Sequence, residues 1–484
     1  MNRQDAATSK TGATRSLGRW AAEAGGDWSP GVMAIAAHAW EDTLVSAIAG
    51  AGDAGTEIVR KSLAGGGAVP VIGGLLRVSP AEAALANGYA AHAVEMDENF
   101  LIGLGHLCAV AVPAILSTAH ELDAEGREAL DALIVASEVM ARVGSAMSRA
   151  HTDRGWHGTS TLGVLAAAAA CGRLRGLNAQ QMTHALGIAV SMSSGPKIQF
   201  GTAVKPLHAG WAAQAGVMAA ALASQGLRPS EEALEGEHGF GQMYAGVRAV
   251  DWSGVTPRTG EPLAIETAGM AFKLWPACGS THKAIAGVLA LRQAHGFCAD
   301  DVASVEVEVG YGNMVNLKYS RPQNHKEAQF SMPYALALAL RNGRLTLADY
   351  TAHAVRDEAT RQLMPRIKMV VQPSSVEGSE SATNHLPHRV TIHLQDGRCL
   401  EQWVPHMKGS LGDPLTAQDR KAKFDMCCNG ILPRERVEVV RRMLSEPLAV
   451  PVRSLMALLA FPAGGDDGER FLRSLDSSVG EMVL

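Results

Sequence analysis

The chain has 484 residues, of which 47% are hydrophobic and 19% charged, and its net charge is −5 at pH 7. This length exceeds one typical hydrophobic core, so we expect two domains. The acidic balance, with no lysine and arginine cluster interleaved with aromatic residues, argues against a nucleic-acid partner. The seven cysteines form no CxxC pair, which argues against a zinc knuckle and favours a reducing, cytoplasmic location.

The first sixteen residues are polar and lack the apolar core of a secretory signal, so we expect a disordered tip. Two long segments without charged side chains, apart from histidine, lie at 155–172 and 209–226. Both are rich in small residues and fall short of the roughly 20 strongly apolar residues that span a bilayer. They predict buried helices that pack closely, and no membrane partner.

Residues 28–271 have a mostly helical pattern. Ser79, followed by Pro80 and Glu82, predicts a helix that begins with a capping box. Asn178 and Gln181 repeat the device. Ser230, ahead of two glutamates, predicts a further helix start.

The pattern changes near residue 273. Apolar and polar residues alternate at 302–312 and again at 388–398, which predicts two half-exposed strands, the second ending in a hairpin turn. Between them, residues 331–355 predict two helices joined by a glycine-containing turn. Thr416 as a helix N-cap and the segment 433–447 predict that the chain then becomes helical again.

These elements predict a mainly α fold with an α+β insert. We expect residues 1–270 and 404–484 to form one large helical domain. Residues 271–403 are then a smaller α+β lid domain.

Five stretches combine histidine or lysine with glycine or quiet surroundings: 94–110, 151–163, 200–210, 272–284 and 324–337. One histidine beside glycine is more often a structural residue than a catalyst. Five such stretches favour a proton-transfer site, because these sites gather histidine, lysine and tyrosine from several elements. No metal-ligand spacing, nucleotide-binding loop or nucleophile elbow is present, so we predict neither a metal nor an organic cofactor.

Five motifs give the chain a resemblance to a known family: "RGWHGTSTLG", "FGTAVKPLHAGWAA", "FKLWPACGSTH", "EAQFSMPYALALAL" and "DPLTAQDRKAKF". Together and in this order they resemble the MmgE/PrpD family. That family includes 2-methylcitrate dehydratase, cis-aconitate decarboxylase and iminodisuccinate epimerase. The resemblance implies a helical domain with an α+β lid, a homodimer, and a small carboxylate substrate held between the domains without metal or organic cofactor.

The resemblance also implies site residues. Those expected to act in catalysis are His106, His157, Lys205, Cys278 and Tyr334. Those expected to bind substrate are Glu95, Asp97, Arg154, His208, Lys273 and His282. Cys278 stands where related decarboxylases have a histidine, and it is either a thiol acid or base or a small buried residue.

Lys205 stands at the start of a segment dominated by alanine and glycine. A cation acts strongly on a carboxylate where water is scarce, and burial lowers a lysine pKa. We therefore expect a buried, partly neutral lysine in the empty site; the alternative is a lysine that reaches the surface from a helix end. The apolar loop 100–105 and Trp211 replace polar residues of many family members, which disfavours a citrate-like substrate.

The predicted function is that of a cofactor-independent lyase, a dehydratase or decarboxylase, that moves a proton at a carbon next to a carboxylate. One alternative is an epimerase of an iminodisuccinate-like dicarboxylate. A second is a non-catalytic homologue that binds a carboxylate or has a structural role.

Overall fold

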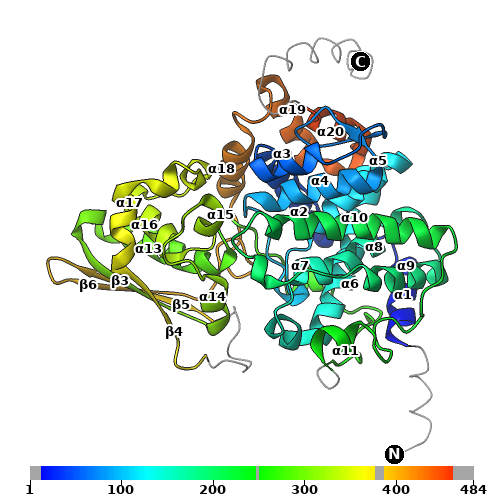
Figure 1. Ribbon diagram of the computed structural model, residues 1–484, viewed down its shortest axis with the longest axis horizontal. Helices are drawn as coiled ribbons and strands as arrows, with labels where there is room; N and C mark the ends of the chain where they lie inside the picture. The colour runs from blue at the N-terminus through cyan, green and yellow to red at the C-terminus, as the bar shows by residue number, and fades with distance from the viewer. Residues whose placement is uncertain (1–11, 247–249, 376–385, 462–484) are drawn as a thin grey trace, which may run out of the picture.

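The computed structural model describes residues 12–246, 250–375 and 386–461, which form a large helical body and a smaller body built on a β-sheet (Figure 1). Residues 1–11 of the predicted disordered tip lie outside this range. The last part of that tip is helical instead, because α1 (Ala13–Glu23) buries Leu17 and Ala21 against the core. Across the described residues, no helix has the length and apolarity needed to cross a bilayer.

The helical body begins with twelve helices separated by turns and two short strands. These helices are α1, α2 (Pro30–Gly50), α3 (Ala54–Lys61), α4 (Pro80–Ala93), α5 (Cys108–Leu122), α6 (Gly126–Asp153), α7 (Gly158–Thr161), α8 (Gly163–Leu174), α9 (Ala179–Ser191), α10 (Val204–Ser224), α11 (Phe240–Ala245) and α12 (Ala264–Thr267). The strands β1 (Val69–Pro70) and β2 (Arg77–Val78) pair antiparallel.

Small residues let these helices approach one another closely. A Cβ atom on Gly88 of α4 would lie 2.9 Å from the Cα of Gly210 in α10. A Cβ atom on Gly50 of α2 would lie 1.9 Å from the carbonyl oxygen of Ala90. Helix α4 is therefore packed between α2 and α10 with no room for larger side chains.

Two of the three predicted helix starts in this body are confirmed. Capping boxes begin α4 at Ser79 and α9 at Asn178. The start predicted at Ser230 is wrong, because residues 231–238 form turns. Here the backbone N–H of Leu234 donates to the Oγ1 of Thr14 at 3.0 Å, so a contact with α1 replaces a helical hydrogen bond.

The smaller body contains a four-stranded sheet in the order β4-β3-β5-β6, in which only the β3–β4 pair is parallel. Its elements are α13 (Gly279–His295), β3 (Val302–Val309), α14 (Tyr311–Asn316), α15 (His325–Ala328), α16 (Met332–Asn342), α17 (Glu358–Leu363), β4 (Ile367–Val371), β5 (His388–Leu394) and β6 (Cys399–Val404). The two predicted strands are confirmed as β3 and β5, and β5 continues through a hairpin into β6.

The predicted pair of helices at 331–355 is half right. Its first member is α16, which begins at an N-cap, Ser331. Its second member is replaced by 3-10 turns at Leu347–Tyr350 and Ala354–Arg356. Asp349 accepts hydrogen bonds from the backbone and hydroxyl of Thr346 at 2.7 and 2.9 Å, which stabilises a short turn there.

After β6 the chain becomes helical again, as the sequence predicts, in α18 (Ala417–Cys428), α19 (Arg434–Ser445) and α20 (Val452–Leu459). Helices α18 and α19 contact α2, and α20 contacts α5. Figure 1 shows α19 and α20 with the helical body, far from the sheet. One hydrophobic core contains residues between 13 and 272 and between 424 and 461, and a second contains residues between 275 and 400. We propose, from these contacts, that 1–270 with 404–484 and 271–403 are the two domains.

Candidate active site

An acidic segment follows α4 where the two bodies meet. Glu95 has a φ of 54°, in the left-handed region that non-glycine residues seldom adopt. Four residues later, Asn99 and Ala271 exchange two backbone hydrogen bonds of 2.8 and 2.9 Å. The pairing places the acidic segment beside the chain that leads to Lys273. Such strained positions persist only where surrounding structure enforces them, and they cluster at functional sites.

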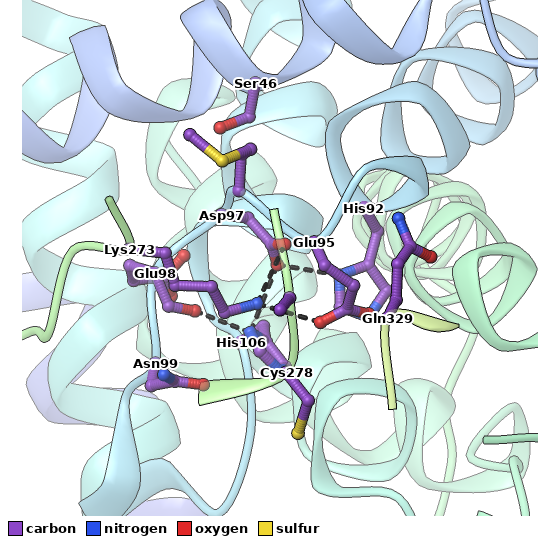
Figure 2. A network of polar contacts seen from close by, with 12 residues as sticks. Ser46, His92, Glu95, Asp97, Glu98, Asn99, His106, Lys273, Cys278 and Gln329 are labelled. Atoms are coloured by element: carbon purple, nitrogen blue, oxygen red, sulfur yellow. Dashed lines mark hydrogen bonds and ion pairs between the residues drawn. The ribbon is translucent and has the colours of Figure 1, made fainter. Parts of the chain in front are cut away.

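Glu95 forms buried ion pairs with two lysines. One carboxylate oxygen accepts from Lys205. The other accepts from Lys273, whose Nζ lies at 2.9 Å (Figure 2). Burial opposes ionisation of Glu95, but Lys205 and then Lys273 outweigh it and hold the pKa of Glu95 below its ordinary value. Burial also opposes the charge of Lys273, but Asp97 and Glu95 outweigh it and raise the Lys273 pKa. Glu95 and Lys273 are therefore both charged.

Lys205 lies in the first turn of α10, where the helix dipole disfavours a cation. Its Nζ lies 6.0 Å from the ring centre of Phe200 and 5.5 Å from that of Phe330. Burial lowers the pKa of Lys205, although Glu95 opposes this. The predicted burial of Lys205 is confirmed. Glu95 provides a counter-charge that the sequence did not predict.

Asp97 binds two imidazoles. Its Oδ2 lies 2.7 Å from the Nδ1 of His92 and 3.1 Å from the Nδ1 of His106. The Nδ1 of His106 also lies 2.6 Å from the carbonyl oxygen of Glu98, to which it donates. Burial lowers the pKa of His92 to about 3 and also lowers that of His106, although Asp97 opposes both shifts. Both rings are therefore neutral at pH 7, with Nδ1 as the donor and Nε2 as the free base.

His157 and His208 form a second imidazole pair, with 3.0 Å between their Nδ1 atoms. His157 precedes α7, and its backbone N–H donates to the carbonyl oxygen of Gly195 at 2.9 Å. Burial and then Lys205 lower the pKa of His157 well below its ordinary value, and they lower that of His208 to about 4. The Nε2 of His157 is buried and has no hydrogen-bond partner among the described residues. An unpaired, neutral imidazole nitrogen is poised to exchange a proton with a bound molecule.

A cavity of about 760 Å³ lies between the two bodies, and it contacts the ion-paired residues Glu95 and Lys205 as well as imidazoles described above. Glu95, His106, His157 and Lys205 line it from the helical body. Cys278 lines it from the other side, directly before α13, and its backbone N–H donates to the carbonyl oxygen of Gln329 at 2.8 Å. Burial and then Glu95 raise the pKa of the Cys278 thiol, so this group is protonated at pH 7.

Six of the predicted site residues do not lie among the described residues that line this cavity. Asp97, Lys273 and His208 contact residues that do, namely His106, Glu95 and His157.

The other three are Arg154, His282 and Tyr334. Arg154 is exposed beyond the end of α6. His282 is buried within α13, and its Nε2 lies 3.2 Å from the carbonyl oxygen of Ala277. Tyr334 is buried in the core of the smaller body, where its hydroxyl donates to the carbonyl oxygen of Asp349 at 2.5 Å. The cavity-facing roles predicted for these three side chains do not fit their positions, because their polar atoms face solvent or nearby backbone.

The sequence alone misses His92 and Glu98. His92 lies in the last turn of the alanine-rich α4, where a lone histidine is normally structural. Glu98 is buried, and its Oε1 accepts from the backbone N–H of Cys108 at 2.9 Å. Burial and then Asp97 raise the pKa of Glu98 well above its ordinary value. The sequence signal that could have indicated them is proximity along the chain, because both residues lie within six positions of Glu95 and Asp97.

Within the described residues, His92, His106 and His157 form the one group able to hold a metal ion, with ligand atoms within 4.8 Å of one another. Lys205 and Lys273 would oppose a divalent cation electrostatically, whereas Glu95 and Asp97 would attract it. The metal-free site expected from the sequence remains a prediction.

The site geometry is that of a buried, charged centre between a helical and an α+β body, and comparison with known proteins gives the family. The MmgE/PrpD N-terminal domain matches residues 15–253 and the MmgE/PrpD C-terminal domain matches residues 275–446. The chain belongs to the MmgE/PrpD family. It is 26% identical over 373 residues to a cis-aconitate decarboxylase of Mus musculus, which covers 75% of this chain and 74% of that protein. It is 25% identical over 492 residues to a cis-aconitate decarboxylase of Aspergillus terreus, which covers 96% and 99% respectively.

Proposed function

We propose that this protein is a lyase that acts on a small di- or tricarboxylic acid by proton transfer next to a carboxylate, without a cofactor. The observation that carries the proposal is the buried, unpaired Nε2 of His157, a residue that lines the cavity together with Lys205. The names of the curated relatives support decarboxylation among the possible reactions.

The lysines bind the substrate carboxylate and stabilise the negative charge that develops on it during the reaction. Lys205 has three donor hydrogens, and Glu95 accepts one of them. The remaining donors can bind an incoming carboxylate in a setting of low dielectric, where a cation acts strongly. Lys273 pairs with the other oxygen of Glu95 and keeps this carboxylate ionised beside Lys205.

The imidazoles transfer the proton. In a decarboxylation, the carbon–carboxylate bond breaks and carbon dioxide leaves. The electron pair left on the carbon delocalises toward a neighbouring carboxylate. A proton donor then protonates this carbon, and the electron pair forms a new carbon–hydrogen bond. In a dehydration, a base takes the carbon-bound proton and the hydroxyl leaves with a proton as water. His157 and His106 are the neutral side chains placed to exchange these protons.

The test is a thermal-shift panel of di- and tricarboxylic acids, followed by proton NMR in heavy water on each acid that stabilises the enzyme. We expect at least one acid to bind and to be converted with loss of carbon dioxide or water. Incorporation of deuterium at one carbon of an otherwise unchanged acid would indicate an epimerase and reject the lyase. Binding without any chemical change would reject catalysis in favour of a binding protein.

A further inference from the structure

We propose that the substrate is a carboxylic acid that bears an extended apolar substituent. This inference rests on the proposed function and specifies its substrate class. Six apolar side chains line the same cavity as Glu95 and Lys205: Leu101, Ile102, Leu104, Met270, Met407 and Leu411.

The first three of these side chains belong to a loop whose backbone is fixed. Phe100 and Gly105 pair through backbone hydrogen bonds of 2.8 and 3.3 Å, and Leu104 between them has a φ of 57°. A Cβ atom on Gly144 of α6 would lie 2.3 Å from the carbonyl oxygen of Ile102, so the loop packs directly on that helix. Because the backbone is held on both sides, the loop keeps its leucines at the cavity in the empty protein.

The other three side chains continue this apolar surface on the neighbouring chain segments. Met407 Sδ lies 3.6 Å from the Nδ2 of Asn99, the residue that precedes the loop by one position. Leu411 contacts Gly269, where a Cβ atom would lie 2.4 Å from the leucine Cγ. We define these six residues as the apolar wall. Methionine side chains adapt to ligands of varied shape, which suits a flexible alkyl group.

Part of the apolar wall is open. Leu101 is 38% exposed and Leu411 is 54% exposed, although both line the cavity. When a ligand covers exposed leucines in a binding cavity, apolar surface is removed from water and the complex is stabilised. A cavity of about 760 Å³ also lies within the roughly 300–1,000 Å³ typical of sites for much larger ligands than a bare dicarboxylate. The charged cluster binds the acid group, and the apolar wall is left for a substituent.

The test measures Kd by calorimetry for succinate and its 2-methyl, 2-propyl and 2-pentyl derivatives with the full-length protein. Complete burial of one methylene strengthens binding by about fourfold. We expect affinity to rise along the series, so that 2-pentylsuccinate binds about tenfold to a hundredfold more tightly than succinate. Equal or falling affinity along the series would overturn the inference.

Variants locate the effect. Leu101→Asn with Leu411→Asn should remove most of the gain from the alkyl chain, so that the ratio of the Kd of succinate to that of 2-pentylsuccinate falls toward one. Leu227→Asn, at an exposed leucine outside the cavity, is the matched control and should leave the series intact. A full gain in the double variant would show that the substituent lies elsewhere and overturn the inference. Failure of every acid in this series and in the thermal-shift panel to bind would instead reject the proposed function itself.

Discussion

Glu95 and Lys205 lie 110 positions apart in the chain and form a buried ion pair that joins the end of α4 to the start of α10. The pair has a cost and a use. Two charges leave water, and the lysine stands at the unfavourable end of a helix dipole. In return, a buried ammonium group is held at the cavity, where it acts strongly on a bound carboxylate.

We predict that Lys205→Ala removes turnover and also destabilises the protein. Removal of one partner leaves Glu95 with Lys273 alone, and breaking a buried pair typically costs about 3 kcal/mol or more. Urea unfolding at pH 7 measures the loss, with Lys61→Ala as a control at an exposed lysine. A Lys205→Ala protein as stable as wild type would show that the pair contributes nothing to folding.

His157→Gln should reduce kcat by about 10²–10⁴-fold, the usual contribution of a general acid or base. Glutamine approximates the size of the ring, and it retains a group able to bond with His208. We therefore expect the melting temperature to change little. His208→Gln is the informative comparison, since His208 contacts His157 but does not line the cavity. An equal loss of kcat in both variants would move the proton-transfer role from His157 to the pair.

Helix starts can be predicted from a single sequence where the contacts that fix them are local. Ser79 and Asn178 fix helix starts through contacts within three residues, so both were predictable. Ser230 also has a local signal, the two glutamates that follow it, but a contact with Thr14, more than 200 residues away, prevents the helix. Local signals cannot anticipate such long-range competition.

The candidate site shows the same limit. The motifs predicted Lys205 and His157 at a shared site, and the cavity contains both. They did not predict the ion pairs of Glu95, because its two lysine partners lie 110 and 178 positions away. Tyr334 stands in an equally good motif, yet its hydroxyl bonds to Asp349. The residue type gives the available chemistry, and only the packing shows whether a side chain faces the cavity.

Stability should fall steeply as the pH falls below about 6.5. Burial lowers the pKa to about 3 in four histidines: His38, His92, His282 and His388. Each folded-state pKa is below the unfolded value, so the contribution is complete above pH 6.5 and is lost as the pH falls toward 3. Each histidine contributes a slope of about 1.4 kcal/mol per pH unit in this window.

Three carboxyl groups oppose this trend. One is Glu41, whose pKa is raised by burial. Burial raises the pKa of Asp42 to about 6 and raises that of Glu98 well above its ordinary value, so all three favour the folded state as the pH falls. The four histidines outnumber them, and we expect a net loss. Urea unfolding at pH 7, 6 and 5 measures it, and His388→Gln should reduce the slope by the share of one histidine. Stability that stays constant from pH 7 to 5 would contradict these neutral, buried rings.

Turnover should survive complete removal of divalent metal ions. His92, His106 and His157 have the geometry to attract one, but Lys205 already supplies positive charge to the cavity, and Lys273 is paired with Glu95, which lines it. A metal would therefore duplicate the lysines' task of binding a carboxylate and stabilising developing charge. The measurement is turnover after dialysis against a chelator, together with the metal content of the same sample. Loss of turnover that Zn²⁺ or another divalent ion restores would show that the three imidazoles are metal ligands. Unchanged turnover in metal-free protein would leave proton transfer as their role, and His157→Gln would then be the variant that removes it.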